Sequence, residues 1–348
     1  MSLRALASAA LVAVLAFAAS ADAAQAASSG PPPPQSTNGQ AVELVASGLK
    51  TPTSFAFGGG SVFEGDGGNS EGNAPPNGGV YVLQSGAATE IAGSPQFVGG
   101  LAWHDNSLYV SGGVVGSAGV SWQIDKWSGW NGKAFSSQTA VYTAPKGLDG
   151  LNGLGFGADG RLFVGVDVGL TDNNDHGPAS KSPYLYDILS MTAEGKGVTV
   201  FAKGIRQPWQ FAFPAGSSSP FVTDLGQDKG AKNPPDFILR VSKGQQYGFP
   251  KCNHTSARAC TKDATPFERF KPHTDPMGIA IEGDHLYLTS FAGPAGKGPG
   301  GEVFSLPLHG GKLKPLVTGF VAPTVGLGVA EGYLYVGELT GEVFRVKI

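Results

Sequence analysis

The sequence has 348 residues and a formal net charge of −3, with 27 acidic side chains against 24 lysines and arginines. Without a basic excess it lacks the electrostatic surface by which proteins bind nucleic acids or anionic membranes. Only 15% of the residues are charged and 54 are glycine. Such a chain is poor in helix formers and rich in turns, which predicts an all-β fold.

The N-terminal segment is predicted to be a cleavable signal peptide covering residues 1–26. Arg4 gives a positive start, residues 5–19 are apolar, and Ala21-Asp22-Ala23 offers a small-residue cleavage site. The apolar run is short for a membrane span, and no other stretch is long and apolar enough. We therefore expect a secreted or periplasmic protein without a membrane span.

Residues 27–40 follow as a spacer that contains four consecutive prolines, Pro31 to Pro34. This composition favours a disordered, solvated segment over a packed core. The rest of the chain, residues 41–348, is predicted to be one domain.

Six segments of that domain share one pattern, in which a short apolar run, a turn and a second apolar run follow one another. The first runs centre on Phe55, Leu101, Leu154, Phe211, Ile279 and Leu327, and the second runs on Phe63, Tyr109, Phe163, Val222, Tyr287 and Tyr335. Runs of this kind between glycine and aspartate turns are typical of strands. Units of about 45–60 residues with four strands each are typical of propeller blades.

The sixth repeat is one strand short, because it ends with the strand expected at residues 341–346. A further strand, expected at residues 41–45, precedes the first repeat and would complete the last one. The sequence therefore predicts a six-bladed β-propeller closed by its N-terminal strand, which leaves no free sheet edge at the junction.

The loops after the second strands are long, whereas the turns between first and second strands are short. The ligand site is therefore expected on the long-loop face. Asp66, Asp224 and Glu338 stand at one repeated position on that face. They suit a cation or a polar ligand, but aspartate is also a common turn residue.

The two cysteines, Cys252 and Cys260, lie in one polar segment. In an oxidising compartment a local disulfide is expected. The alternative is a metal site that includes His254, although zinc sites normally have four ligands.

Residues 147–348 carry a series of ordered motifs. They include Gly204-Ile205-Arg206-Gln207-Pro208, the strand and loop of residues 222–228, Tyr247-Gly248-Phe249-Pro250 and His273-Thr274-Asp275-Pro276. Their order and spacing resemble the glucose/sorbosone dehydrogenase family of soluble quinoprotein propellers.

The resemblance implies a pyrroloquinoline quinone (PQQ) cofactor held with Ca²⁺ on the long-loop face. Arg206 and Gln207 match the segment that binds the quinone, and the carbonyl groups of Gly226 and Gln227 match the loop that binds Ca²⁺. Lys297 lies in the next long loop and is a candidate partner for a cofactor carboxylate. For Arg206 the alternative role is a salt bridge between blades.

The sequence departs from the family at the catalytic base. In the family a catalytic histidine stands just before the second-blade strand and takes the proton of the substrate hydroxyl. Counted back from Phe156, that position holds Asp149 in this chain, and aspartate is a weaker base at its ordinary pKa. His176 and His273 are alternatives, and the segment from Asp236 lacks the usual glutamate and asparagine.

Two functions follow. The first is an exported PQQ-dependent dehydrogenase that oxidises a sugar or aldehyde, with Asp149 and Arg206 as catalytic residues and a separate electron acceptor. The second is a propeller that has lost the redox chemistry and binds a carbohydrate or a protein. A cavity beside Arg206, Gln207 and Gly226 wide enough for a tricyclic ring would favour the first.

Overall fold

The computed structural model describes residues 32–69, 77–84, 86–117, 119–168, 181–227, 233–254, 260, 262–292 and 300–348. The predicted signal peptide, His176 and Lys297 lie outside these residues. The described residues contain no helix, and hence no apolar helix that could cross a membrane. The account below concerns the unit from Pro33 to Ile348.

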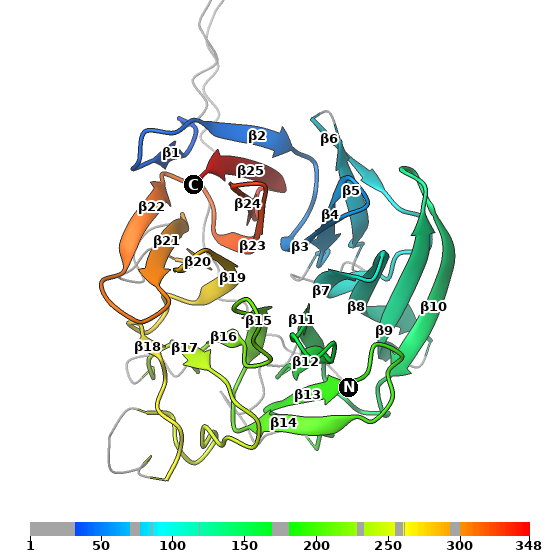
Figure 1. The fold of residues 1–348 in the computed structure, drawn as a ribbon, viewed down its shortest axis with the longest axis vertical. Helices are drawn as coiled ribbons and strands as arrows, with labels where there is room; N and C mark the ends of the chain where they lie inside the picture. Colours follow the sequence, from blue (N-terminus) through cyan, green and yellow to red (C-terminus); the bar gives the residue numbers. More distant parts are fainter. Residues whose placement is uncertain are drawn as a thin grey trace, which may run out of the picture. The chain divides into compact units, whose positions relative to one another are not determined.

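Six antiparallel sheets form a ring, as Figure 1 shows. Blade 1 contains β3 (Pro52–Gly58), β4 (Ser61–Asp66), β5 (Gly79–Gln84) and β6 (Ala87–Glu90). Blade 2 contains β7 (Phe97–His104), β8 (Ser107–Gly116), β9 (Gly119–Trp130) and β10 (Phe135–Thr143). Blade 3 contains β11 (Leu151–Phe156), β12 (Leu162–Val166), β13 (Asp187–Met191) and β14 (Thr199–Lys203).

The remaining three blades complete the ring. Blade 4 contains β15 (Pro208–Ala212), β16 (Phe221–Asp224), β17 (Phe237–Arg240) and β18 (Glu268–Arg269). Blade 5 contains β19 (Pro276–Glu282), β20 (His285–Ser290), β21 (Glu302–Pro307) and β22 (Lys314–Thr318). Blade 6 contains β23 (Thr324–Ala330), β24 (Tyr333–Glu338) and β25 (Glu342–Lys347). The six-bladed propeller predicted from the repeats is confirmed.

The closure of the ring is confirmed as well. Strand β2 (Val42–Ala46) pairs antiparallel with β25 as the outer strand of blade 6, with Val42 opposite Val346 and Leu44 opposite Phe344. In Figure 1 the blue N-terminal strand lies directly beside the red C-terminal strand. Strand β2, near the N-terminus, and strand β25, at the C-terminus, thus share one sheet.

A short strand also forms within the segment expected to be a disordered spacer. Strand β1 (Gln35–Ser36) pairs with β22 and gives blade 5 a fifth strand. The Thr37 N–H donates to the Leu316 carbonyl at 2.8 Å, and Pro34 is buried. The edge of β22 offers backbone groups without a sheet partner, which is why even a polar segment can pair there.

Neighbouring blades pack through glycines on their first strands. A Cβ on Gly153 would lie 2.5 Å from the Phe211 ring, and one on Gly328 would lie 2.7 Å from Phe55. The phenylalanines of one blade therefore cover the glycines of the preceding blade. This close approach explains why the first strands carry glycine between apolar residues.

Hydroxyl groups on the second strands join three pairs of blades. Thr223 donates to the Met277 carbonyl at 2.7 Å, and Thr289 donates to the Val325 carbonyl at 2.9 Å. Ser111 makes a longer bond to the Gly153 carbonyl at 3.5 Å. These bonds fix the first strand of each next blade near the axis, where the candidate site begins.

Candidate functional site

The three carboxylates at the repeated position bind the backbone of their own blades. Asp66 accepts from Lys50 N–H at 2.6 Å, Asp224 from Gln207 N–H at 2.8 Å, and Glu338 from Ala322 N–H at 2.7 Å. Each donor precedes the first strand of the same blade. The turn role, which was the alternative to a cation site, accounts for this repeated position.

Arg206 lies before β15 and is buried, with 4% of its surface exposed. Its Nη1 donates to Gln207 Oε1 at 2.8 Å and to the Leu225 carbonyl at 3.1 Å. Both bonds stay within blade 4 and aim the guanidinium at the loop that follows β16. A buried guanidinium held in this way is a fixed positive charge at the long-loop end of the blade.

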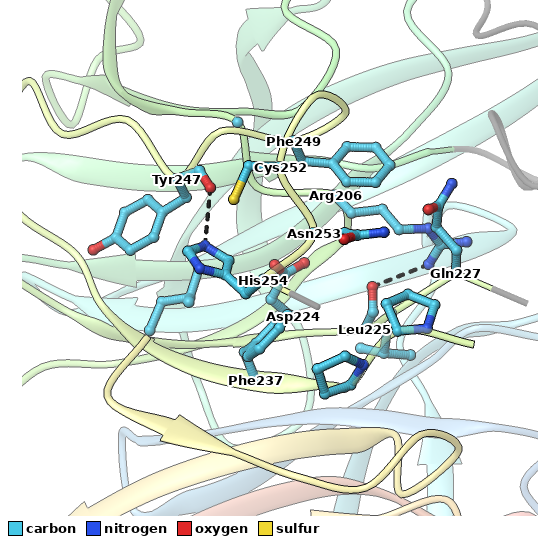
Figure 2. Close-up of a pocket in the computed structure, with 15 residues that line it drawn as sticks. Arg206, Asp224, Leu225, Gln227, Phe237, Tyr247, Phe249, Cys252, Asn253 and His254 are labelled. Carbon is cyan, nitrogen blue, oxygen red and sulfur yellow. Dashed lines mark hydrogen bonds between the residues drawn. The ribbon is translucent and has the colours of Figure 1, made fainter. Parts of the chain in front are cut away.

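One small cavity brings Arg206 together with Asp224, Gly226 and Gln227 (Figure 2). Its other walls come from β17 and from the segment that follows it, which contributes Tyr247, Phe249, Cys252, Asn253 and His254. The enclosed volume is ≈ 20 Å³, which is room for about one water molecule. Arg206 and the predicted calcium-binding loop therefore do meet, but in a narrow space.

Asp224 supplies the carboxyl group that lines this cavity. Burial raises its pKa to about 7, although the Gln207 N–H and the Arg206 guanidinium act in the opposite direction. A carboxyl group with that pKa exists in both protonation states at neutral pH. It can therefore either accept or donate a proton there.

Asp236 ties the blade-4 loop to the segment before blade 5. Its Oδ1 accepts from Gly226 N–H at 2.7 Å, and its Oδ2 accepts from Thr274 N–H and Asp275 N–H at 3.0 Å each. Burial raises its pKa, and these three donors oppose that shift. Asp236 therefore organises the loop through backbone amides.

The predicted disulfide between Cys252 and Cys260 is present, with the two Cα atoms 5.4 Å apart. It closes the loop that carries His254 over the cavity. His254 is buried, and its Nε2 lies 3.1 Å from the Tyr247 carbonyl oxygen. Figure 2 shows both residues beside Cys252.

The structure does not place the other predicted site residues on this cavity. Asp149 is half-buried before β11, where its N–H donates to Ser182 Oγ at 3.0 Å, and it is not among the lining residues. The Gln207 side chain turns to Arg206. His273 is exposed and contacts Asn233, while Lys297 lies outside the described residues.

Sequence reasoning missed Tyr247, Asn253 and His254 as residues of the site. The sequence analysis named Tyr247 only within a motif and His254 only as a possible metal ligand, because these residues reach Arg206 through the fold of an irregular segment. The wall formed by Phe249 was signalled by the Tyr247-Gly248-Phe249-Pro250 motif alone.

The central channel is crossed by a polar side chain. Gln210 of blade 4 donates through Nε2 to the Thr53 carbonyl of blade 1 at 3.2 Å and to the Gly99 carbonyl of blade 2 at 3.3 Å. Near the long-loop end, Asn152 Nδ2 and Trp209 Nε1 are buried and make no hydrogen bond to any described residue. These two donors lie at the starts of β11 and β15 and suit an oxygen-rich ligand or water.

The described residues around Arg206 do not fit PQQ and Ca²⁺ inside the cavity. A space for one water molecule is far below the roughly 300 Å³ or more of ordinary cofactor sites. Ca²⁺ takes six to eight oxygen ligands. Among the described residues no three carboxylates converge there, and Asp224 is only partly ionised at neutral pH. A tricyclic ring would have to lie over the face, outside the cavity.

No protein-family model and no curated protein matches this chain. Its fold is similar to that of a protein from Thermus thermophilus assigned as an oxidoreductase (glucose dehydrogenase), at 20% identity and a TM-score of 0.66. That match covers 88% of this chain and 100% of the other.

Two further solved structures share the fold. A gluconolactonase from Xanthomonas campestris matches with 12% identity, a TM-score of 0.54 and coverage of 91% of this chain and 94% of the other. A protein assigned as a gluconolactonase, structural genomics target DrR130, matches with 13% identity, a TM-score of 0.57 and coverage of 89% and 92%. At these identities the likeness establishes the six-bladed propeller fold.

Proposed function

We propose that this propeller binds and acts on a sugar or a sugar-derived small molecule at its long-loop face. The observation that carries the proposal is the meeting of Arg206 and Asp224 on one cavity at the end of blade 4. The motif resemblance and the assigned activities of two neighbours, a glucose dehydrogenase and a gluconolactonase, support the class of substrate.

The residues supply two kinds of chemistry. Arg206 offers a fixed positive charge to a carbonyl, carboxylate or developing oxyanion. Asp224, with its pKa of about 7, offers a group that can take a hydroxyl proton at neutral pH. Asp149, before β11 on the same face, is the other candidate base.

The finer form of the proposal is a quinone-dependent dehydrogenase with PQQ and Ca²⁺. When bound over the face beside Arg206, such a cofactor would supply the redox chemistry. Because the described cavity does not fit the ring, we assign no reaction step to it. The alternative, a binding module without redox chemistry, is favoured by the narrowness of that cavity.

A cofactor titration separates these possibilities. Mature protein free of quinone is mixed with PQQ and Ca²⁺, separately and together, while its melting temperature and the reduction of a dye by aldoses are followed. A rise in melting temperature that needs both additions, with substrate-dependent dye reduction, would support the dehydrogenase. Aldoses or lactones that raise the melting temperature without turnover would support the binding module.

Variants then assign the base. Loss of turnover in Asp224→Asn but not in Asp149→Ala would assign the base to Asp224, and the reverse result to Asp149. Asp159→Asn, in an exposed turn on the opposite face, is the matched control and should behave as the wild type. If neither cofactor, aldose nor lactone changes the melting temperature, the proposal is wrong.

We further propose that the protein is exported. The Cys252–Cys260 disulfide supports this, because disulfides persist mainly in oxidising compartments. Mass spectrometry of the protein from the periplasm or medium should show a chain that begins after the Ala21-Asp22-Ala23 motif. A full-length chain confined to the cytoplasm would contradict export.

A further inference from the structure

The disulfide loop brings three soft-metal ligands together. A ring nitrogen of His254 and the sulfur atoms of Cys252 and Cys260 all lie within 4.8 Å of one another. Among the described residues no other three metal-ligating side chains are so close. Cys252 is 1% and His254 9% exposed, and the bond to the Tyr247 carbonyl holds the imidazole in place.

A carboxylate lies at the same corner. The Asp263 Oδ2 atom and the Cys252 Cβ atom lie 2.5 and 2.6 Å from the point where a Cβ on Gly248 would stand. Glycine leaves this space open at a φ of +91°. The Asp263 N–H also donates to the Cys260 carbonyl at 3.2 Å. Asp263 therefore approaches the cluster through both its backbone and its side chain.

We propose that reduction of the disulfide converts this loop into a zinc site formed by Cys252, Cys260 and His254, with Asp263 as the fourth ligand. Two sulfurs, one nitrogen and one oxygen are a donor set that suits tetrahedral Zn²⁺. A dithiol reductant gives two electrons and two protons to the S–S bond and becomes a disulfide itself. Zn²⁺ then binds the two thiolates and displaces their two protons.

The zinc site would adjoin the candidate functional site without depending on its function. Cys252 and His254 line the same cavity as Arg206 and Asp224. Metal binding would therefore place a positive ion beside that cavity only under reducing conditions. The inference holds whether or not the propeller acts on sugars.

Metal titration of the full mature chain tests the proposal. The protein is reduced anaerobically with a phosphine and is then desalted. In the reduction the phosphine takes an oxygen atom from water and becomes a phosphine oxide. Zn²⁺ is titrated against a chromophoric chelator, and Co²⁺ is used as an optical probe for thiolate-to-metal charge transfer. We expect one ion per reduced chain and none per oxidised chain. Equal binding by the two forms would overturn the proposal.

Three variants identify the ligands. Cys260→Ser should abolish binding under reducing conditions, and His254→Asn should weaken it by roughly tenfold or more. His309→Asn, which changes an exposed histidine in a turn, is the control and should bind as the reduced wild type does. Wild-type affinity in His254→Asn would remove the histidine from the site.

A melting experiment covers the case in which the reduced chain loses structure. Circular dichroism of the reduced protein is followed on heating with and without Zn²⁺. Binding to the folded loop should raise the melting temperature, or restore a cooperative transition if the metal-free loop has unfolded. A reduced chain that gains nothing from Zn²⁺ by either measure would contradict the proposal.

Discussion

Glu64 is the least favourable residue of the described core. It lies on β4 opposite Phe55 of β3, fully buried, and neither carboxylate oxygen makes a hydrogen bond to a described residue. The corresponding positions of four other blades, which pair with their own first strands, hold Val110, Val222, Leu288 and Val336. Burial raises the pKa of Glu64 well above its ordinary value and Asp66 adds to that shift, while the backbone N–H of Thr53 acts in the opposite direction.

Replacing this carboxyl group should stabilise the protein. Glu64→Val restores the side chain that three of those blades carry and should add about 2 kcal/mol to the free energy of unfolding at pH 7. The folded state holds the proton of Glu64 to higher pH than the unfolded state, so wild-type stability falls as the pH rises above 4.5. The gain should therefore be small at pH 4 and large at pH 7, measured by urea unfolding.

Glu64→Gln serves as the control, because it removes the charge and keeps a buried polar group. Like Glu64→Val, it should lack the loss of stability that the wild type shows as the pH rises, but it should gain less stability than Glu64→Val. A Glu64→Val protein that is less stable than the wild type at pH 7 would show that the carboxylate has a stabilising partner.

Asp224 should give a second pH dependence. Its pKa rises from 3.8 to about 7 on folding, so the wild type loses stability as the pH rises across that window. Asp224→Asn keeps an oxygen that can accept from Gln207 N–H and removes the titration. The variant should lack that loss, which is on the order of 4 kcal/mol at most. Identical urea-unfolding profiles from pH 4 to 8 would contradict the pKa of about 7.

Single residues of this kind were only partly predictable from the sequence. The repeated position identified Asp66, Asp224 and Glu338 as a set, but their backbone partners depend on where each preceding loop folds back. Nothing in the sequence indicated that Glu64 is fully buried, since alternation alone does not say which face of β4 meets blade 6.

At the scale of the strand, the first strands approach one another more closely than side chains would allow. Gly153 of β11 combines a positive φ of +62° with the Phe211 ring 2.5 Å from its missing Cβ. Gly160, in the turn after β11, has a similar φ of +72° and nothing within 4 Å. A comparison of alanine substitutions at these two glycines therefore distinguishes the cost of backbone strain from the cost of overpacking.

Gly153→Ala should therefore cost more than Gly160→Ala. In both variants an alanine must adopt a positive φ, which lowers the free energy of unfolding by about 1 kcal/mol each. Only Gly153→Ala must also displace Phe211 or the β15 backbone. Overpacking of this kind typically adds roughly 1–3 kcal/mol. Chemical denaturation of the two proteins measures the difference, and equal losses would show that the blades separate without strain.

The strands were predictable because their signals are local. Apolar runs such as Leu334-Tyr335-Val336 and Leu286-Tyr287-Leu288 fall within β24 and β20, and the short turns fall where predicted. The cavity was not predictable, because most of its lining residues come from irregular segments whose course depends on tertiary contacts. Arg206 and Gly226 do converge, as the motif resemblance implied, whereas Asp149 is not part of their cavity.

At the scale of the whole molecule, one pair of strands closes the ring. Deleting residues 32–46 removes β1 and β2 and exposes the edge of β25. The melting temperature should fall by on the order of 10 °C, since such a loss is worth several kcal/mol. A synthetic peptide of residues 41–47 should restore part of the loss, and a scrambled peptide of the same composition should not. Unchanged melting would mean that closure contributes little.

The pairing of β2 with β25 also sets an order of events during synthesis. A ribosome releases β2 at the beginning of translation, but its partner emerges only with the last residues of the domain. Until then blade 6 is incomplete, and β2 has no place in the sheet that finally holds it. The complete propeller is thus a post-translational product.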